Sequence, residues 1–191
     1  MNKANTNDPL TRMRRSDRAQ DDVWIRAFLH RAPFGFLATL VNEQPFINSN
    51  LFVYDEAAHV IYMHTAREGR TRANIEGDQR VCFSAAEMGR LLPADTALEM
   101  SVEYAGVVVF GRAAVVSDEA EAQHGLQLLL DKYCPHLRPG RDYRPITDEE
   151  LSRTSVYRIQ IEQWSGKKKE AAADFPGAFF YGQPPLGSRK P

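Results

Sequence analysis

The sequence predicts a mainly β protein, with one curved antiparallel sheet or small barrel and helices at its front and near its end. About six segments alternate apolar and polar residues as strands do, at spacings typical of hairpins. The alternation of strand and helix that builds a parallel α/β sheet is missing. A valine-rich segment, residues 102–116, contains Gly106 and Gly111, which are typical of the bulges and bends that let a sheet curl.

Length and composition fit one ordinary domain. A chain of 191 residues can bury a core without disulfide bonds. Its 24 Lys and Arg against 25 Asp and Glu give no electrostatic case for a nucleic-acid binder. No apolar run approaches the roughly 18 residues of a membrane span, and the first residues lack the apolar centre of a secretory signal. We therefore expect a cytoplasmic protein in which Cys82 and Cys134 are free thiols.

The chain divides into three parts. Residues 1–11 are polar and predict a mobile tail. Residues 12–167 contain all the periodic segments and predict one domain. Residues 168–191, rich in Gly, Pro and aromatic residues without a period, predict an extended or disordered tail.

Outside residues 45–77, helix signals occur in three places. Ser16 or Asp17 could cap a helix that runs to about Arg31, before Pro33. A second helix is predicted after an Asp cap at position 118, over residues 118–133.

A capping box, formed by Thr147 and Glu150, predicts one further short helix. The predicted strands are residues 34–40, 46–53, 60–64, 80–85, 102–116 and 155–162. Residues 87–100 contain Gly89 and Pro93 and predict an irregular loop.

Residues 45–75 combine a predicted hairpin with a cationic turn. Residues 46–53 and 60–64 form the two strands, with a turn between them. Asn48 and Asn50 add amides to one face of the first strand, which also carries apolar side chains. A strand that both packs and offers hydrogen bonds is suited to the wall of a binding site.

The turn after this hairpin predicts an anion site. Arg67, Arg70 and Arg72 surround Gly69 at the start of a short helix that ends near Gly77. Guanidinium groups bind phosphate in a bidentate manner, and the free N–H groups of a helix start add partial positive charge. The alternative is a solvated helix edge, and both interpretations stay open at this level.

Single polar residues near the strand ends carry the same ambiguity. His64, on the return strand, could hydrogen-bond a ligand or be a satisfied histidine at a sheet end. Glu103 and Tyr104 could contact a ligand or be polar residues at a sheet end. Trp164, which follows the last predicted strand, could pack at an edge or offer a stacking surface.

Common catalytic signatures are missing from the sequence. It contains no GxSxG, HExxH, CxxC, Walker or GxGxxG pattern, and no two histidines have the spacing of metal ligands. We therefore expect no catalytic nucleophile and no metal site, and the pattern favours a bound cofactor.

Several short motifs, taken in order, resemble the flavin-binding split-barrel proteins. They are RRSDR at 14–18, APFGFLAT at 32–39, FVY at 52–54, YMHTA at 62–66, GR at 69–70, VFGRA at 109–113 and WSGK at 164–167. The resemblance covers roughly residues 13–167. It is strongest to the pyridoxamine 5'-phosphate oxidase-related group that contains the 5-nitroimidazole resistance proteins.

The resemblance implies a six-stranded antiparallel Greek-key split β-barrel. It also implies a homodimer with one FMN in each of two clefts at the subunit interface. The residues implied around the flavin are Asn48, Ser49, Asn50, Leu51 and Phe52 along the ring, Met63, His64 and Thr65 at its flank, Arg67, Gly69, Arg70 and Thr71 at the phosphate, and Trp164 on the partner's side. The family commonly has a lysine where this chain has Thr71, so one cation is missing.

Three functions follow as hypotheses. The first is an FMN-dependent oxidoreductase that acts on a small molecule, resembling a nitro-compound reductase or a pyridoxamine-phosphate oxidase. The second is a non-catalytic split barrel that stores or senses flavin or haem, with His64 or another histidine as an axial ligand. The third is an interaction module with an empty cleft, suggested by Thr71 and the aromatic residues of the C-terminal tail.

Overall fold

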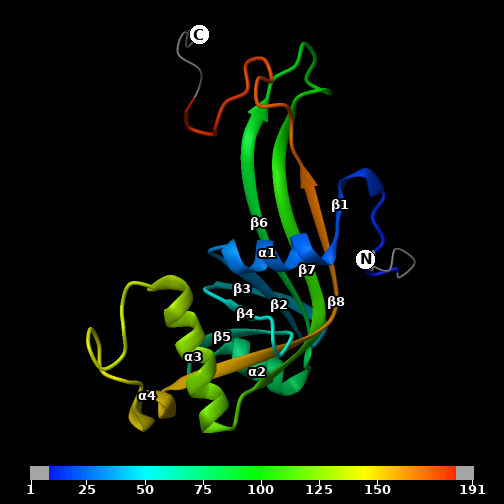
Figure 1. Cartoon of the computed structure of the whole chain (residues 1–191). Helices are drawn as coiled ribbons and strands as arrows, with labels where there is room; N and C mark the ends of the chain where they lie inside the picture. The colour runs from blue at the N-terminus through cyan, green and yellow to red at the C-terminus, as the bar shows by residue number, and fades with distance from the viewer. Residues whose placement is uncertain (1–8, 184–191) are drawn as a thin grey trace.

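One eight-stranded antiparallel sheet forms the centre of the molecule in the computed structural model, which describes residues 9–183 (Figure 1). The strand order is β3-β2-β6-β7-β8-β5-β4, and β1 pairs with β8. A 3-10 turn, Ser16–Arg18, precedes the sheet. The elements are β1 (Ala19–Gln20), α1 (Asp22–Arg31), β2 (Gly35–Val41), β3 (Gln44–Asn50), β4 (Val53–Asp55), β5 (Val60–Ala66), α2 (Arg70–Gly77), β6 (Arg80–Leu92), β7 (Ser101–Val115), α3 (Glu119–Tyr133), α4 (Asp148–Ser152) and β8 (Thr154–Lys169).

The predicted first strand of the hairpin, residues 46–53, is in fact two strands. Its first part, β3, pairs with β2, whereas its last part lies in β4 and pairs with β5. Asn50 makes the break, because its Oδ1 accepts a hydrogen bond from the Leu51 N–H at 2.8 Å and its Nδ2 donates to the His64 carbonyl. Since β3 and β4 lie at opposite ends of the strand order, the Asn50 side chain links the two sides of the sheet.

Two apolar clusters hold the helices on the sheet. Ile25 and Phe28 of α1 are at most 1% exposed and belong to the main core, which includes residues from β2 and β4 to β8. The first residue of β2, Gly35, lies against the Phe83 ring. A side chain does not fit there, because a Cβ would lie 2.3 Å from that ring. A smaller cluster packs Ala122 and Leu129 of α3 against β4, β5 and β8.

The helix starts were predicted with mixed success. The Asp118 cap of α3 and the capping box of Thr147 with Glu150 are confirmed. The prediction for the first helix is wrong at its start, because Asp21, whose carboxylate accepts from the Trp24 N–H, caps α1. Cys82 and Cys134 are free and partly buried, as predicted.

Strands β6, β7 and β8 continue well beyond the body of the domain, and Figure 1 shows them as a projection above α1. The prediction of an irregular loop over residues 87–100 is therefore wrong for its first part. The strand β6 runs to Leu92, and its register with β7 shifts between Met88 and Leu91, where Gly89 lies against Glu103. The last strand is also longer than predicted and contains Trp164.

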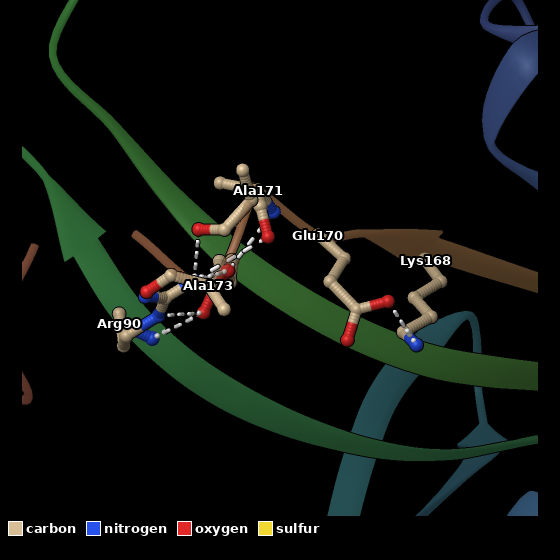
Figure 2. Close-up of polar contacts among 7 residues, drawn as sticks. Arg90, Lys168, Glu170, Ala171 and Ala173 are labelled. Carbon is tan, nitrogen blue, oxygen red and sulfur yellow. Dashed lines mark hydrogen bonds and ion pairs between the residues drawn. The ribbon is translucent and has the colours of Figure 1, made fainter. Parts of the chain in front are cut away.

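The segment after β8 lies along this projection. Leu91 and Phe179 exchange backbone hydrogen bonds of 2.7 and 3.1 Å. The Arg90 guanidinium donates to the carbonyls of residues 171–173, as Figure 2 shows for Ala171 and Ala173. We call residues 170–183 the C-terminal arm; the first eight residues of the predicted N-terminal tail and residues 184–191 lie outside the described part.

Candidate functional site

The cationic turn lies between β5 and α2, where the sequence placed it. Gly69 is the N-cap of α2 with φ of 150°, a backbone conformation that residues with a side chain rarely adopt. No side chain caps the helix, so the first backbone N–H groups of α2 lack a capping acceptor within residues 9–183. A Cβ at Gly69 would meet nothing within 4 Å, so this helix start opens onto free space.

The three arginines of the turn have different roles. The Arg72 guanidinium donates to Glu76 at 2.8 Å and to the Ser155 hydroxyl at 3.1 Å, so it holds α2 on the sheet. Arg70 instead lies 5.1 Å above the Phe46 ring of β3, and neither Arg70 nor Arg67 forms a side-chain ion pair with a described residue. Two exposed guanidiniums therefore flank the open helix start.

Thr71 lies on the inner side of α2. Its exposed fraction is 6%, and the neighbouring Asn74 donates to the Thr39 hydroxyl of β2 at 2.8 Å. The Thr71 side chain is thus part of the packing, although its backbone N–H belongs to the open helix start.

The edge strand β3 forms the neighbouring wall. It pairs with β2 on one side and, among the described residues, has no strand partner on the other. Asn48 and Asn50 are half buried, whereas Ser49 and Leu51 are exposed. The free edge of β3 therefore offers backbone and amide groups to a ligand.

Phe52 differs from the residues before it. Its side chain is fully buried, and its N–H and carbonyl both bond the Tyr133 hydroxyl, at 3.1 and 2.9 Å. Lys132 donates to the same carbonyl at 3.0 Å, and burial lowers the pKa of Lys132 to about 8. The Phe52 backbone and side chain are thus held within the fold. Lys132 and Tyr133 of α3, which fix the segment between β3 and β4 at Phe52, were not predicted from the sequence. The helical period that identified α3 did not indicate this role.

Of the three predicted residues on β5, only His64 has an unused polar atom. Met63 is 1% exposed, and the Thr65 hydroxyl bonds the Tyr157 hydroxyl at 2.7 Å. His64 is partly buried, and its Nδ1 has no hydrogen-bond partner in the described chain. Burial also lowers the pKa of His64, so its ring is neutral near pH 7. A buried polar atom without a partner is costly, and a ligand that hydrogen-bonds it would remove that cost.

The structure does not place Trp164 beside the cationic turn of the same chain. Its indole donates to Asp22 at 2.8 Å, and its ring packs against Tyr54 and His59. Glu103 is paired with Arg90, and the Tyr104 hydroxyl accepts from Arg18 at 2.9 Å. Trp164 therefore lies beside α1, and Glu103 and Tyr104 lie on the projecting part of β7.

Residues 9–183 offer neither a metal cluster nor a membrane-spanning helix. No group of three or more His, Cys, Asp or Glu there could hold a metal ion. Nor does this part of the chain contain a helix with the length and apolar character needed to cross a bilayer.

Comparison with known proteins gives a family and a fold. The family model described as pyridoxamine 5'-phosphate oxidase matches residues 21–168. Among proteins with curated descriptions, no sequence matches significantly.

Solved structures match over most of the chain. The flavocytochrome Anf3 from Azotobacter vinelandii is 24% identical with a TM-score of 0.74, covering 86% of this chain and 75% of its own. An FAD and haem binding protein from Mycobacterium smegmatis is 20% identical with a TM-score of 0.72, covering 82% and 76%. A putative 5-nitroimidazole antibiotic resistance protein from Bacteroides thetaiotaomicron is 17% identical with a TM-score of 0.64, covering 79% and 89%. These likenesses confirm the predicted fold class, a split barrel with flanking helices.

Proposed function

Because this chain belongs to the pyridoxamine 5'-phosphate oxidase family, we propose that it binds a flavin, FMN in the first instance, at the start of α2. One observation carries the proposal: Arg67 and Arg70, both without ion pairs to described residues, flank an uncapped helix start that opens at Gly69. A phosphate there would receive backbone N–H groups and charge-assisted bonds from two guanidiniums. The cation missing at Thr71 is replaced by Arg67 in this arrangement.

The isoalloxazine ring would lie along the free edge of β3. That edge exposes Ser49 and partly exposes Asn48 and Asn50, and the exposed Leu51 follows directly after β3. Since Asn50 also bonds the His64 carbonyl, the ring would come close to the histidine whose Nδ1 has no partner in the described chain. Phe52, Met63 and Thr65 would support this wall from behind.

We further propose that the protein is an oxidoreductase. A bound flavin would supply the electron-transfer chemistry. This chain would bind and orient the flavin and would partly exclude water from its ring. The neutral ring of His64 is suited to a hydrogen bond to the flavin or to a small substrate. A nitro compound or a phosphorylated pyridine is the substrate class that the resemblance suggests. A homodimer, in which Trp164 or Tyr104 approaches the partner's flavin, completes this proposal.

The test is flavin titration of the purified protein, followed by absorption and fluorescence. The Arg70→Ala variant should weaken FMN binding by about 10 to 100-fold, the range expected for a lost charge-assisted contact. Arg80→Ala is the matched control, because Arg80 is an exposed arginine that pairs with Asp78 at the other end of α2. Unchanged affinity in Arg70→Ala would show that the phosphate does not bind here. Bleaching of the bound flavin by reduced pyridine nucleotide tests the redox activity.

A second candidate is a non-catalytic flavin or haem binding protein. It is favoured by two of the matched structures, which are described as a flavocytochrome and as an FAD and haem binding protein. His64 is a candidate axial ligand, because its Nδ1 has no partner among the described residues. A Soret band that appears when the wild-type protein is titrated with haem, and that is lost in His64→Ala, would support this candidate. A haem spectrum that does not change when the wild-type protein is added would contradict it.

A further inference from the structure

One histidine joins the turn between β4 and β5 to the neighbouring strand β8. His59 has a φ of 55°, in the left-handed region that a residue with a side chain seldom adopts. Its ring packs on Trp164 of β8, with the ring centroids 4.7 Å apart, and its Nδ1 lies 3.1 Å from the Tyr54 hydroxyl of β4. The Trp164 indole donates in turn to Asp22, so the contact continues to the start of α1.

The hydrogen bonds around Tyr54 determine which form of His59 fits. The Arg26 guanidinium of α1 hydrogen-bonds the Tyr54 hydroxyl, and a guanidinium can only donate. The Tyr54 oxygen therefore accepts from Arg26, and its own proton is donated to Nδ1 of His59. Nδ1 accepts a proton in this way only when the imidazole is neutral. Since Tyr54 is 2% exposed, water has little access to replace His59 as the acceptor.

We propose that His59 forms an acid-sensitive contact, which holds the β4–β5 turn to Trp164 when the imidazole is neutral and releases it when the imidazole is protonated. Protonation would place an N–H opposite the Tyr54 O–H, and neither group could accept. It would also place a second cation beside Arg26, whose guanidinium lies 5.6 Å above the Trp164 ring. This behaviour needs no bound flavin.

Two carboxylates face the imidazole, and both already have partners. Asp22 accepts from the Trp164 indole at 2.8 Å. Glu56, in the turn, contacts His30 at 3.0 Å and Arg26 at 3.6 Å. Neither carboxylate is therefore free to form a dedicated ion pair with a protonated imidazole.

The surroundings as a whole favour the neutral form of His59. Burial is the largest cause that lowers its pKa and Arg26 is the next, whereas Asp22 and Glu56 oppose the shift in part. From β8, Gln160 bonds only the His59 carbonyl, at 3.5 Å. Because the pKa is lowered, the unfolded chain takes up a proton at a higher pH than the folded one. The contribution of this group to folding therefore falls as the pH decreases below the ordinary value of 6.5.

Other contacts of the β4–β5 hairpin do not involve His59. At the end away from the turn, the Asn50 amide donates to the His64 carbonyl. On the side of α3, Asp55 contacts His124 at 3.0 Å, and protonation of His124 would strengthen that pair. The hairpin should therefore stay on the sheet in acid, and the release should be confined to the side that faces Trp164.

Fluorescence of Trp164 tests the inference. In full-length protein with Trp24→Phe, Trp164 is the only indole. Acrylamide quenching of Trp164 should increase as the pH falls from about 7.5 to about 5, with a midpoint below 6.5. His59→Asn should abolish this response, because asparagine tolerates the positive φ and does not titrate. His30→Asn is the matched control, since His30 is an exposed histidine of the same cluster, and it should keep the response.

A second variant keeps His59 itself and so tests the inference even if His59→Asn does not fold. Arg26→Gln removes the neighbouring cation but keeps a donor for the Tyr54 hydroxyl, so the midpoint should move to higher pH. Constant quenching of Trp164 over the whole interval would overturn the inference. So would an equal response in His59→Asn, or a midpoint in Arg26→Gln that stays the same or falls.

Discussion

Arg90 and Glu103 form an ion pair of 2.7 Å across the β6–β7 projection, with side chains only 19% and 12% exposed. The pair also holds the C-terminal arm. Glu103 accepts from the Ala171 N–H at 2.9 Å, and Arg90 donates to three carbonyls of the arm. Figure 2 shows the Arg90 contacts beside the separate pair of Lys168 and Glu170.

Glu103→Gln should therefore loosen the arm. The substitution keeps the shape of the side chain but removes the charge that Arg90 and Ala171 bond. Hydrogen exchange at the Leu91 and Ala171 amides should become roughly tenfold faster, as expected for the loss of a charge-assisted bond. Glu170→Gln is the control, because the Glu170 side chain is 66% exposed and bonds only Lys168 in the described structure. Equal protection in Glu103→Gln and wild type would contradict a holding role.

Acid should release the same contact. The Arg90 guanidinium, with help from the Ala171 N–H, lowers the pKa of Glu103 to about 2 from its ordinary 4.5. Because its pKa is lowered, the charged Glu103 carboxylate stabilises the state in which the C-terminal arm is bound to β6 and β7. This stabilisation is complete above about pH 4.5 and is lost as the pH falls toward 2. Amide protection of the arm, corrected for intrinsic exchange, should decrease over this interval in the wild type. A decrease of the same size in Glu103→Gln would assign it to another group.

Lys132 should give a stability change at alkaline pH. Burial lowers its pKa to about 8, so between about pH 8 and 10.5 the unfolded chain holds more protons than the folded one. The contribution of Lys132 to the free energy of unfolding therefore rises as the pH increases over this interval. Relative to Lys132→Met, the wild type should gain about 1 kcal/mol in its free energy of unfolding between pH 8 and 10, allowing for partial exposure of the ammonium. Urea denaturation at the two values measures this gain.

Lys168→Met is the control for Lys132, because Lys168 pairs with Glu170 near the surface. It should show the pH dependence of the wild type. A constant difference between wild type and Lys132→Met from pH 8 to 10 would show that the Lys132 ammonium is not destabilised in the folded state.

Thr71→Lys should reduce stability instead of strengthening the phosphate site. The Thr71 side chain is 6% exposed, so a lysine there would bury a charge or push α2 from the sheet. The free energy of unfolding should fall by about 2 to 4 kcal/mol. Ala73→Lys, which adds the same charge at an exposed position of α2, should leave stability nearly unchanged. Tighter flavin binding with full stability in Thr71→Lys would mean that position 71 faces the ligand.

The sequence alone determined the local features of this protein. The cationic turn, the helix that follows it, the Asp118 cap and the capping box of Thr147 with Glu150 depend on residues within about four positions of one another, and short-range chemistry is enough to predict them. The ordered motifs also identified the family and hence the class of fold.

Only the tertiary structure decided which of these residues are available to a ligand. Arg67 and Arg72 look alike in the sequence, yet Arg72 is held by Ser155, 83 positions away, and Arg67 remains unpaired among the described residues. Asn50 breaks a predicted strand because its amide reaches the His64 carbonyl, and Glu103 holds an arm that begins more than 60 residues later. Such contacts form when distant segments pack side by side, so a pattern that repeats every two or four residues does not contain them.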